Sequence, residues 1–263
     1  MTPRTGGVVL ADKEPGPSSF AVVRRVGRRH GLKTGHAGTL DPFATGLLVC
    51  LLGRATRLAR YLVGLDKRYR TTIRLGVRTT TGDLEGEPLA ETPVATAEEI
   101  ESLRGELELP VPAASAVKIA GERAYALHRR GVAVKMPTRR STVHALEIVC
   151  YEPPELEIDL HVSSGTYVRA LADALGGHCL ALRRTAVGPL EVADADEERL
   201  LPPLAAVPHL ARQEVTPDEL HLVRTGRPVE ARGDGPLALV SAEELVAVAR
   251  VEAGIARPET VLT

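Results

Sequence analysis

The 263-residue sequence contains no tryptophan, only two phenylalanines and five tyrosines. Its core must therefore consist of Leu, Val, Ala and Ile, and an aromatic residue among polar neighbours is a candidate ligand contact. The three cysteines, Cys50, Cys150 and Cys179, form neither a CxxC pair nor an even framework. They are typical of buried thiols in a reducing cytoplasm and argue against a zinc site.

Long apolar runs and a secretory leader are also missing. No apolar stretch approaches the ~18 residues that cross a membrane, and the run Leu47–Leu52 is long enough only for a buried strand. The first residues lack the apolar segment of a signal peptide. Apolar residues at 44% and charged residues at 25% are typical of a globular protein. We expect a cytoplasmic protein without a membrane partner.

The net charge is only −1, but the charges are unevenly distributed. Only five of the 33 basic residues are lysine, and the others are arginine, which suits phosphate and carboxylate partners. Residues 20–78 hold 13 basic and 2 acidic side chains, residues 83–108 hold 1 and 9, and residues 118–140 hold 7 and 1. This pattern fits either solvated faces or a basic nucleic-acid groove with an acidic insertion pointing away from it.

Strand and helix patterns mix without strict βαβ alternation, which predicts an α+β fold with a mainly antiparallel sheet and flanking helices. Residues 34–46 contain three glycines and a proline and are expected to form a loop. Helices are expected at 19–29, 54–62, 96–104, 125–130 and 166–175, with a further start near 215–218. Strands are expected at 7–10, 47–52, 67–75, 141–151, 155–162, 237–240 and 245–251. We expect a catalytic domain at 1–212 and a short β-rich domain at 213–263.

The expected loop contains His36 and Asp41, and glycines there let the backbone approach a ligand closely. A single Asp-Pro pair is usually turn chemistry, and a single histidine is usually surface or core filler. Here the loop lies between a basic helix and a basic strand, and loops braced by such elements often hold catalytic groups. In the strand Lys67–Leu75, Tyr69 lies on the apolar face, where it is either a core tyrosine or a ring that stacks on a ligand.

The loop sequence GHAGTLDPFATGLL closely resembles the catalytic-aspartate motif of the bacterial tRNA pseudouridine-55 synthases, the TruB family. Further segments resemble that family in order: VVLADKEPGPSS, KRYRTTIRLGVRTTTGD, SAVKIAGERAYALHRRG, SSGTYVRALADALG and ALRRTAVG. Together they span residues 7–188, and ordered matches are far more specific than any single motif. The first motif departs from the family at Glu14-Pro15 and at Ser18, which affects loop geometry more than chemistry. The tail resembles a shortened PUA-type RNA-binding domain.

The resemblance implies that Asp41 is the catalytic carboxylate and that Arg169 is its positive partner, since a guanidinium stabilises an ionised carboxylate. Without the resemblance, Arg169 would be taken for a solvated helix residue. Tyr69 is implied in both catalysis and base stacking. The implied substrate contacts are His36, Tyr69, Tyr167 and Leu182.

The implied reaction isomerises uridine to pseudouridine at position 55 of the tRNA TΨC loop, after the base has been flipped out of its stack. The reaction needs no cofactor and no metal ion, and we expect a monomer that binds the T-arm of tRNA without an obligate protein partner. Two alternatives remain open: an RNA-binding factor without turnover, and a glycosidase or nucleosidase. The latter needs a second carboxylate, for which Asp83 is the only weak candidate.

Overall fold

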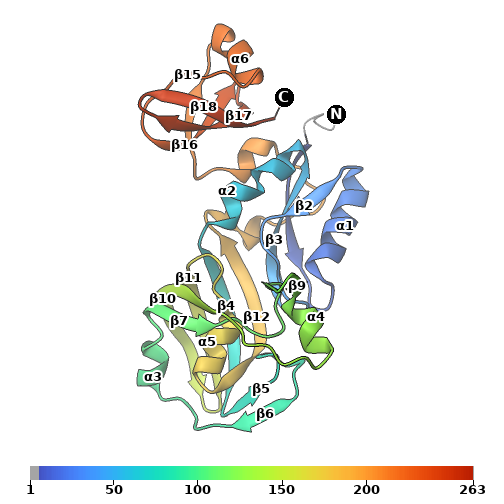
Figure 1. The fold of residues 1–263 in the computed structure, drawn as a ribbon, viewed down its shortest axis with the longest axis vertical. Helices are drawn as coiled ribbons and strands as arrows, with labels where there is room; N and C mark the ends of the chain where they lie inside the picture. The colour runs from blue at the N-terminus through green and yellow to red at the C-terminus, as the bar shows by residue number, and fades with distance from the viewer. Residues whose placement is uncertain (1–5, 263) are drawn as a thin grey trace. The chain divides into compact units, whose positions relative to one another are not determined.

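The computed structural model describes residues 6–262 (Figure 1). The chain divides into two compact units. Unit 1 comprises Met1–Pro42, Gly46–Gly64 and Gly188–Thr263, and unit 2 comprises Phe43–Thr45 and Leu65–Val187. Both units combine antiparallel strands with short helices, which confirms the predicted α+β class. Among residues 6–262, no helix has both the length and the apolar character needed to cross a bilayer.

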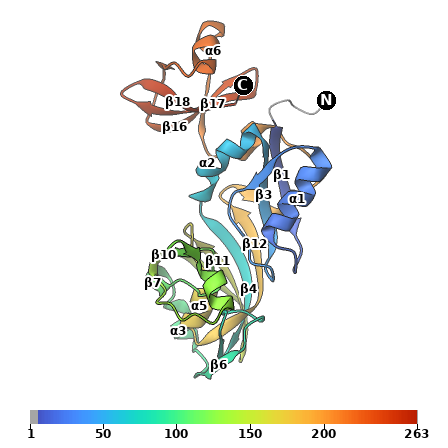
Figure 2. The same ribbon diagram turned by 45° about the vertical axis from the view of Figure 1, so that its right-hand side comes forward.

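The first part of unit 1 consists of antiparallel strands covered by one helix (Figure 2). Strand β3 (Thr45–Gly53) pairs with β1 (Gly6–Lys13) and with β2 (Thr34–His36). Helix α1 (Ser19–His30) buries its valines, begins at the N-cap Ser18 and ends at Gly31, whose φ of 65° suits a residue without Cβ. The predicted helix is therefore confirmed.

The prediction of one continuous loop over 34–46 is wrong at both ends, because β2 occupies residues 34–36 and β3 begins at Thr45. Residues Thr34–His36 are too few to show a strand period, and the pairing of His36 with Cys50 on β3 creates the strand. The helical segment after β3 consists of η1 (Arg54–Leu58) and α2 (Ala59–Val63).

The C-terminal part of unit 1 builds a sheet with its own core. The sheet order is β14-β16-β17-β18-β15, and only the β14–β16 pair is parallel. In this core, Val223 of helix α6 packs with Leu239, Ala247 and Ala249 of the sheet. The elements are β13 (Leu190–Glu191), η2 (Val192–Asp194), η3 (Pro203–Ala206), β14 (Ala211–Glu214), α6 (Pro217–Arg224), β15 (Val229–Glu230), β16 (Gly235–Ser241), β17 (Glu244–Glu252) and β18 (Ile255–Val261).

Unit 2 is built on an antiparallel sheet in the order β12-β4-β11-β10-β7. Strand β4 (Lys67–Leu75) has the predicted bounds and alternates between buried and more exposed residues along its whole length. The remaining elements are β5 (Val77–Thr79), β6 (Pro88–Glu91), α3 (Ala97–Glu101), β7 (Gly105–Pro110), β8 (Lys118–Ile119), β9 (Glu122–Arg123), α4 (Ala124–Arg129), β10 (Thr138–Glu152), β11 (Glu155–Val162), α5 (Val168–Ala174) and β12 (Gly177–Val187).

Two features of the fold were not expected from the sequence. Strand β12 was missed because Arg183 and Arg184 interrupt its apolar pattern, yet Arg184 is 1% exposed. The cysteines were all expected to be buried, which holds for Cys50 and Cys179 but is wrong for Cys150, because its side of β10 faces solvent.

Candidate functional site

Asp41 lies in unit 1, half-buried, in the segment between β2 and β3. The residue before it is fixed by the first residue of α1. The hydroxyl of Ser19, which is 2% exposed, donates to the Leu40 carbonyl at 2.9 Å and accepts from the Leu40 N–H at 2.8 Å. Because a hydroxyl can donate and accept at once, one side chain satisfies both main-chain groups of Leu40.

The residue after Asp41 is fixed from the end of β1. The Lys13 ammonium, with no exposed surface, donates to the Pro42 carbonyl at 2.8 Å and to the Glu14 carbonyl at 3.0 Å. The Gly16 N–H donates to the same Pro42 carbonyl at 2.9 Å. A buried cation is costly unless polar groups surround it, so this lysine is committed to its carbonyl partners. The segment 13–19 therefore holds the main chain on both sides of Asp41.

Arg169 lies in the first turn of α5 in unit 2 and is 3% exposed. Its Nη1 donates to the Thr81 carbonyl at 2.6 Å and lies 3.3 Å from the Asp83 carboxylate, while Nη2 donates to the Ala114 carbonyl at 2.9 Å. The interpretation of Arg169 as a solvated helix residue is thus excluded. Contacts to three different groups fix the position and the orientation of this buried guanidinium.

Asp83 is the counter-charge that sequence reasoning underrated. The run 83–108 was expected to be a solvated acidic face, with Asp83 alone as a support for the neighbourhood of Asp41, and Asp83 is only 4% exposed. Its Oδ1 accepts from the Thr81 hydroxyl at 2.5 Å and from the Glu85 N–H at 3.1 Å, and its other oxygen faces Arg169. The only sequence signal was a Thr-Thr-Thr-Gly-Asp turn, which does not reveal a partner on a distant helix.

Tyr69 and Leu182 share one face of the β4–β12 pair in unit 2. Tyr69 pairs with Arg184 and Leu182 pairs with Thr71, so the two side chains are diagonal neighbours. Tyr69 is 9% exposed and Leu182 is 7% exposed. The Thr45 hydroxyl lies 3.5 Å from the Leu182 carbonyl. The predicted placement of Tyr69 on the buried face is confirmed.

The other two predicted contacts lie at ends of elements. Tyr167 is the half-buried N-cap residue of α5, two residues before Arg169. His36 is half-buried at the end of β2, in unit 1. The structure therefore groups His36 with Asp41 in unit 1, and Tyr69, Tyr167, Arg169 and Leu182 in unit 2.

A third buried cation lies on the same strand as Tyr69. Lys67 is 6% exposed, and its Nζ donates to the Leu65 carbonyl and lies 3.3 Å from the Ser164 hydroxyl. Burial, together with the nearby Arg184 charge, lowers the pKa of Lys67 to about 8. Unit 2 therefore has two buried basic residues, Lys67 and Arg184, on the β4–β12 face that holds Tyr69.

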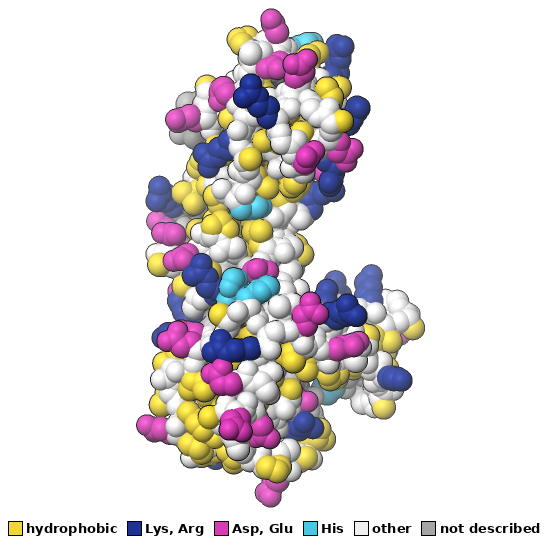
Figure 3. Space-filling view, turned by 90° about the vertical axis from the view of Figure 1, so that its left-hand side faces the viewer, with side chains coloured by type: hydrophobic (Ala, Val, Ile, Leu, Met, Phe, Trp, Pro, Cys, Tyr) yellow, Lys and Arg dark blue, Asp and Glu magenta, His cyan; other side chains and the backbone are white. Residues whose placement is uncertain are grey.

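The exposed face of β4 is less basic than its sequence suggests. Arg70 forms a two-pronged pair with Asp159 at 2.7 and 2.8 Å, and Arg74 lies 3.6 Å from Glu155 on the neighbouring strand β11. Basic and acidic side chains are interspersed over the face shown in Figure 3. These arginines are therefore partly neutralised by their cross-strand neighbours.

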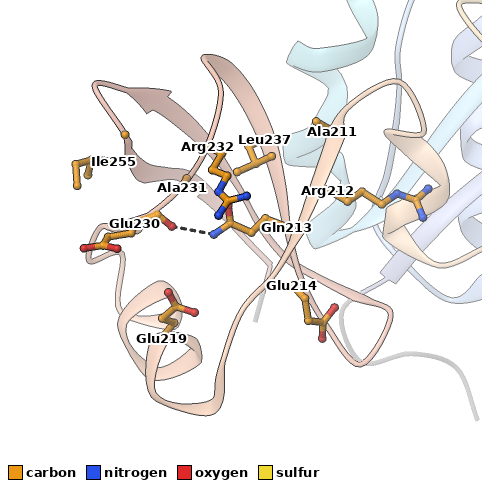
Figure 4. A pocket seen from close by; sticks show the side chains of 11 residues that line it. Ala211, Arg212, Gln213, Glu214, Glu219, Glu230, Ala231, Arg232, Leu237 and Ile255 are labelled. Carbon is orange, nitrogen blue, oxygen red and sulfur yellow. Dashed lines mark hydrogen bonds between the residues drawn. The ribbon is translucent and has the colours of Figure 1, made fainter.

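The C-terminal sheet of unit 1 bears a separate cavity of about 680 Å³ (Figure 4). Arg212 and Arg232 line it together with the three carboxylates of Glu214, Glu219 and Glu230. The Gln213 amide, also in the lining, donates to the Glu230 carbonyl at 2.8 Å. Its mixed charge does not favour a phosphate ligand, and none of the predicted site residues lines it.

Comparison with models of known protein families assigns the chain to one family. The model of the TruB family pseudouridylate synthase N-terminal domain matches residues 24–168, more than half of the sequence. The chain belongs to the TruB family. It is therefore a pseudouridine synthase, an isomerase, and the predicted family and enzyme class are confirmed.

Curated members of the TruB family match over most of the chain. The tRNA pseudouridine synthase B of Mycobacterium sp. (strain KMS) is 40% identical, covering 98% of this chain and 95% of that protein. The tRNA pseudouridine synthase B of Leifsonia xyli subsp. xyli (strain CTCB07) is 48% identical, with 76% and 73% covered. The one from Parasynechococcus marenigrum (strain WH8102) is 44% identical, with 84% of each covered.

Solved structures support the fold assigned to this TruB family member. One chain belongs to a structure of an H/ACA RNP bound to a substrate RNA containing 2′-deoxyuridine. It has a TM-score of 0.72 at 21% identity, covering 98% of this chain and 86% of that chain. A chain of a Cbf5-Nop10-Gar1 complex also gives 0.72, at 23% identity, with 98% and 85% covered. The predicted pseudouridine synthase fold with a small β-rich, PUA-like C-terminal part is confirmed.

Proposed function

We propose that this TruB family member converts the T-loop uridine at position 55 of tRNA to pseudouridine, with Asp41 as the essential carboxylate. The main support is the double anchoring of the Asp41 segment by Lys13 and Ser19. Two buried side chains are committed to main-chain groups on either side of a single carboxylate. Such anchoring is how a protein pre-organises a catalytic group. The tRNA substrate follows from the names of the relatives.

The chemistry requires one carboxylate and no external reactant. The C1′–N1 bond of uridine breaks, the uracil turns, and a C1′–C5 bond forms while C5 loses its proton and N1 gains one. Atoms and electrons balance within the nucleotide, so the proposal includes neither cofactor nor metal ion. An ionised carboxylate can act here as a nucleophile or as an electrostatic partner of the electron-poor carbon, as carboxylates do in glycosidases.

Arg169 is proposed as the positive charge that keeps Asp41 ionised during the reaction. Its own counter-charge, Asp83, fixes the guanidinium rigidly at 3.3 Å. A rigid guanidinium reorganises little as charge develops on the reacting groups, which favours electrostatic stabilisation. Asp83 is therefore proposed as a positioning residue rather than as the second carboxylate of a glycosidase.

The remaining side chains are proposed to receive the flipped base. Tyr69 and Leu182, adjacent on one buried sheet face, offer a ring and an apolar contact for the uracil. Tyr69 is also proposed to act on the proton at C5. Tyr167 is proposed to line the site beside Arg169, and His36 to fill the stack that the base leaves. Unstacking costs a few kcal/mol, which such contacts offset.

The experiment uses tRNA transcripts carrying [5-³H]uridine, from which pseudouridine formation releases tritium. We expect wild-type enzyme to release one equivalent, and carbodiimide mapping to place the product at position 55. A transcript with cytidine at that position should release none. Release of free uracil would instead indicate a nucleosidase, and tight tRNA binding without tritium release would indicate an RNA-binding factor.

A further inference from the structure

The arginines of α1 fall into two stripes with different surroundings. Arg25 and Arg29, four residues apart, face acidic side chains of the C-terminal part of unit 1. The Arg25 Nε donates to Glu197 at 3.0 Å, and Arg29 lies 2.9 Å from Glu198. These two charges are already compensated within the protein.

The second stripe, Phe20, Arg24 and Arg28, also has a four-residue spacing and therefore forms one exposed ridge. Phe20 is 63% exposed although the chain has only two phenylalanines. The Arg24 guanidinium lies 5.3 Å from the centre of its ring. Within residues 6–262, neither Arg24 nor Arg28 has a carboxylate partner.

A groove runs beside this ridge. A cavity of about 360 Å³ is lined by Phe20, Arg24 and Arg28 on α1 and by Leu32 and Thr34 beyond it. Gly27 lets α1 lie close to the segment that follows it, because a Cβ there would approach the Leu32 carbonyl and the Thr34 hydroxyl to 3.0 Å.

The groove adjoins the proposed site residues of unit 1 at both ends. Thr34 and His36 point to the same face of β2, since strand side chains alternate. At the other end, Phe20 directly follows Ser19, which binds Leu40 beside Asp41. The ridge and groove are therefore adjacent in the chain to residues that belong to, or hold, the proposed site of unit 1.

We propose that the Phe20–Arg24–Arg28 ridge is an RNA-contact surface that stacks a nucleobase on Phe20 and neutralises two phosphates with the arginines. The inference rests on the proposed tRNA substrate and adds a defined contact to it. An exposed ring beside arginines that have no carboxylate partner among the described residues is the composition of a nucleic-acid surface. The charge is of one sign, because no acidic residue occurs from Pro15 to Leu40.

The test measures the Kd of tRNA for the full-length protein between 50 and 300 mM salt. We expect Phe20→Ala to weaken binding about tenfold, with Phe20→Tyr close to wild type, because the ring provides the stacking surface. The double variant Arg24→Gln/Arg28→Gln should lower the slope of log K against log salt by about two. The matched control Arg25→Gln/Arg29→Gln, on the paired stripe, should leave that slope unchanged.

Pseudouridine formation separates this inference from the proposed function. We expect the Phe20 and Arg24/Arg28 variants to raise KM for tRNA while retaining kcat. The inference is overturned if both variants bind tRNA with wild-type affinity and salt slope, or if the control lowers the slope equally. Either result, with tritium release intact, leaves the proposed function standing. Failure of wild type to release tritium would contradict the proposed function alone, because binding is measured directly.

Discussion

Asp41 and Arg169, the two charged residues proposed for catalysis, are held in opposite ways. In unit 1, contacts to Leu40 and Pro42 fix the main chain around Asp41, and its side chain is half-buried. In unit 2, the Arg169 side chain itself is fixed, by Asp83 and two carbonyl groups, and is almost fully buried. The position of Asp41 thus depends on hydrogen bonds from Ser19 and the charged Lys13 to the main chain around it, whereas that of the guanidinium depends on contacts of its own side chain, including a buried charge pair.

Among the residues that hold Asp41 and Arg169 in place, the largest effect should come from breaking the charge pair in unit 2. Asp83→Asn leaves the Arg169 guanidinium buried without its counter-charge, which costs about 3 kcal/mol of unfolding free energy. We expect kcat to fall roughly 100-fold, because a misplaced charge no longer stabilises the reacting groups. Urea denaturation and tritium release measure the two effects. Glu85→Gln, next to Asp83 in the same turn, is the matched control and should behave as wild type. Wild-type kcat in Asp83→Asn would show that the pair is only structural.

The next effect should come from the buried lysine that anchors the Asp41 segment. Lys13→Met removes the charged donor to the Pro42 carbonyl, and hydrogen bonds of this kind contribute about 2 kcal/mol. Because Gly16 still donates to that carbonyl, we expect a folded protein whose kcat is lowered at least tenfold by a displaced carboxylate. The tRNA Kd should not change. A loss of binding with kcat retained would contradict the anchoring role.

A smaller loss of stability and activity is expected on replacing Ser19, and its neighbour Ser18 serves as the control. Ser19→Ala leaves the main-chain groups of Leu40 unsatisfied, and we expect a loss of about 1.5 kcal/mol together with a severalfold lower kcat. Ser18→Ala removes only the N-cap of α1, which costs about 1 kcal/mol and should leave kcat unchanged. Thermal denaturation and single-turnover rates distinguish the two variants. Equal kcat values would mean that Ser19 does not position Asp41.

The smallest effect concerns pH and the buried Lys67 of unit 2. Its pKa in the folded state is about 8, below that of an unfolded lysine, because burial and then the Arg184 charge disfavour its protonation. Above pH 8 the unfolded chain therefore binds more protons than the folded one, and the free energy of unfolding rises with pH. Relative to Lys67→Met, wild type should gain stability from pH 8 to pH 10 in urea denaturation. A constant difference would refute the lowered pKa.

Local patterns predicted the elements that depend on local forces. The alternation of Lys67–Leu75 gave the bounds of β4, and the helix expected at 19–29 matches α1 to within one residue. Patterns failed where a distant partner decides the outcome. Strand β2 exists because β3 pairs with it, and Asp83 is buried because Arg169 lies opposite. The basic run of β4 overstated the positive charge of its exposed face for the same reason. The sequence of β4 does not show that Asp159 of β11 pairs with Arg70.

In the proposed site too, sequence patterns identified some residues, whereas residues that act through distant contacts were missed. Asp41, His36 and Arg169 were found through motif resemblance, and Tyr69 also through its position on an apolar strand face. The anchoring roles of Lys13 and Ser19 were not foreseen, because both follow from contacts to carbonyl and N–H groups about 20 to 30 residues away in the chain.

The most direct measurement is single-turnover pseudouridine formation by Asp41→Asn at saturating enzyme, beside its tRNA Kd. Asparagine keeps the shape of the side chain and removes only its charge. We expect the Kd to stay within about threefold of wild type and the rate to fall by roughly 10⁴ or more, as for the loss of a nucleophilic group. A rate within tenfold of wild type would contradict the central role of the Asp41 carboxylate.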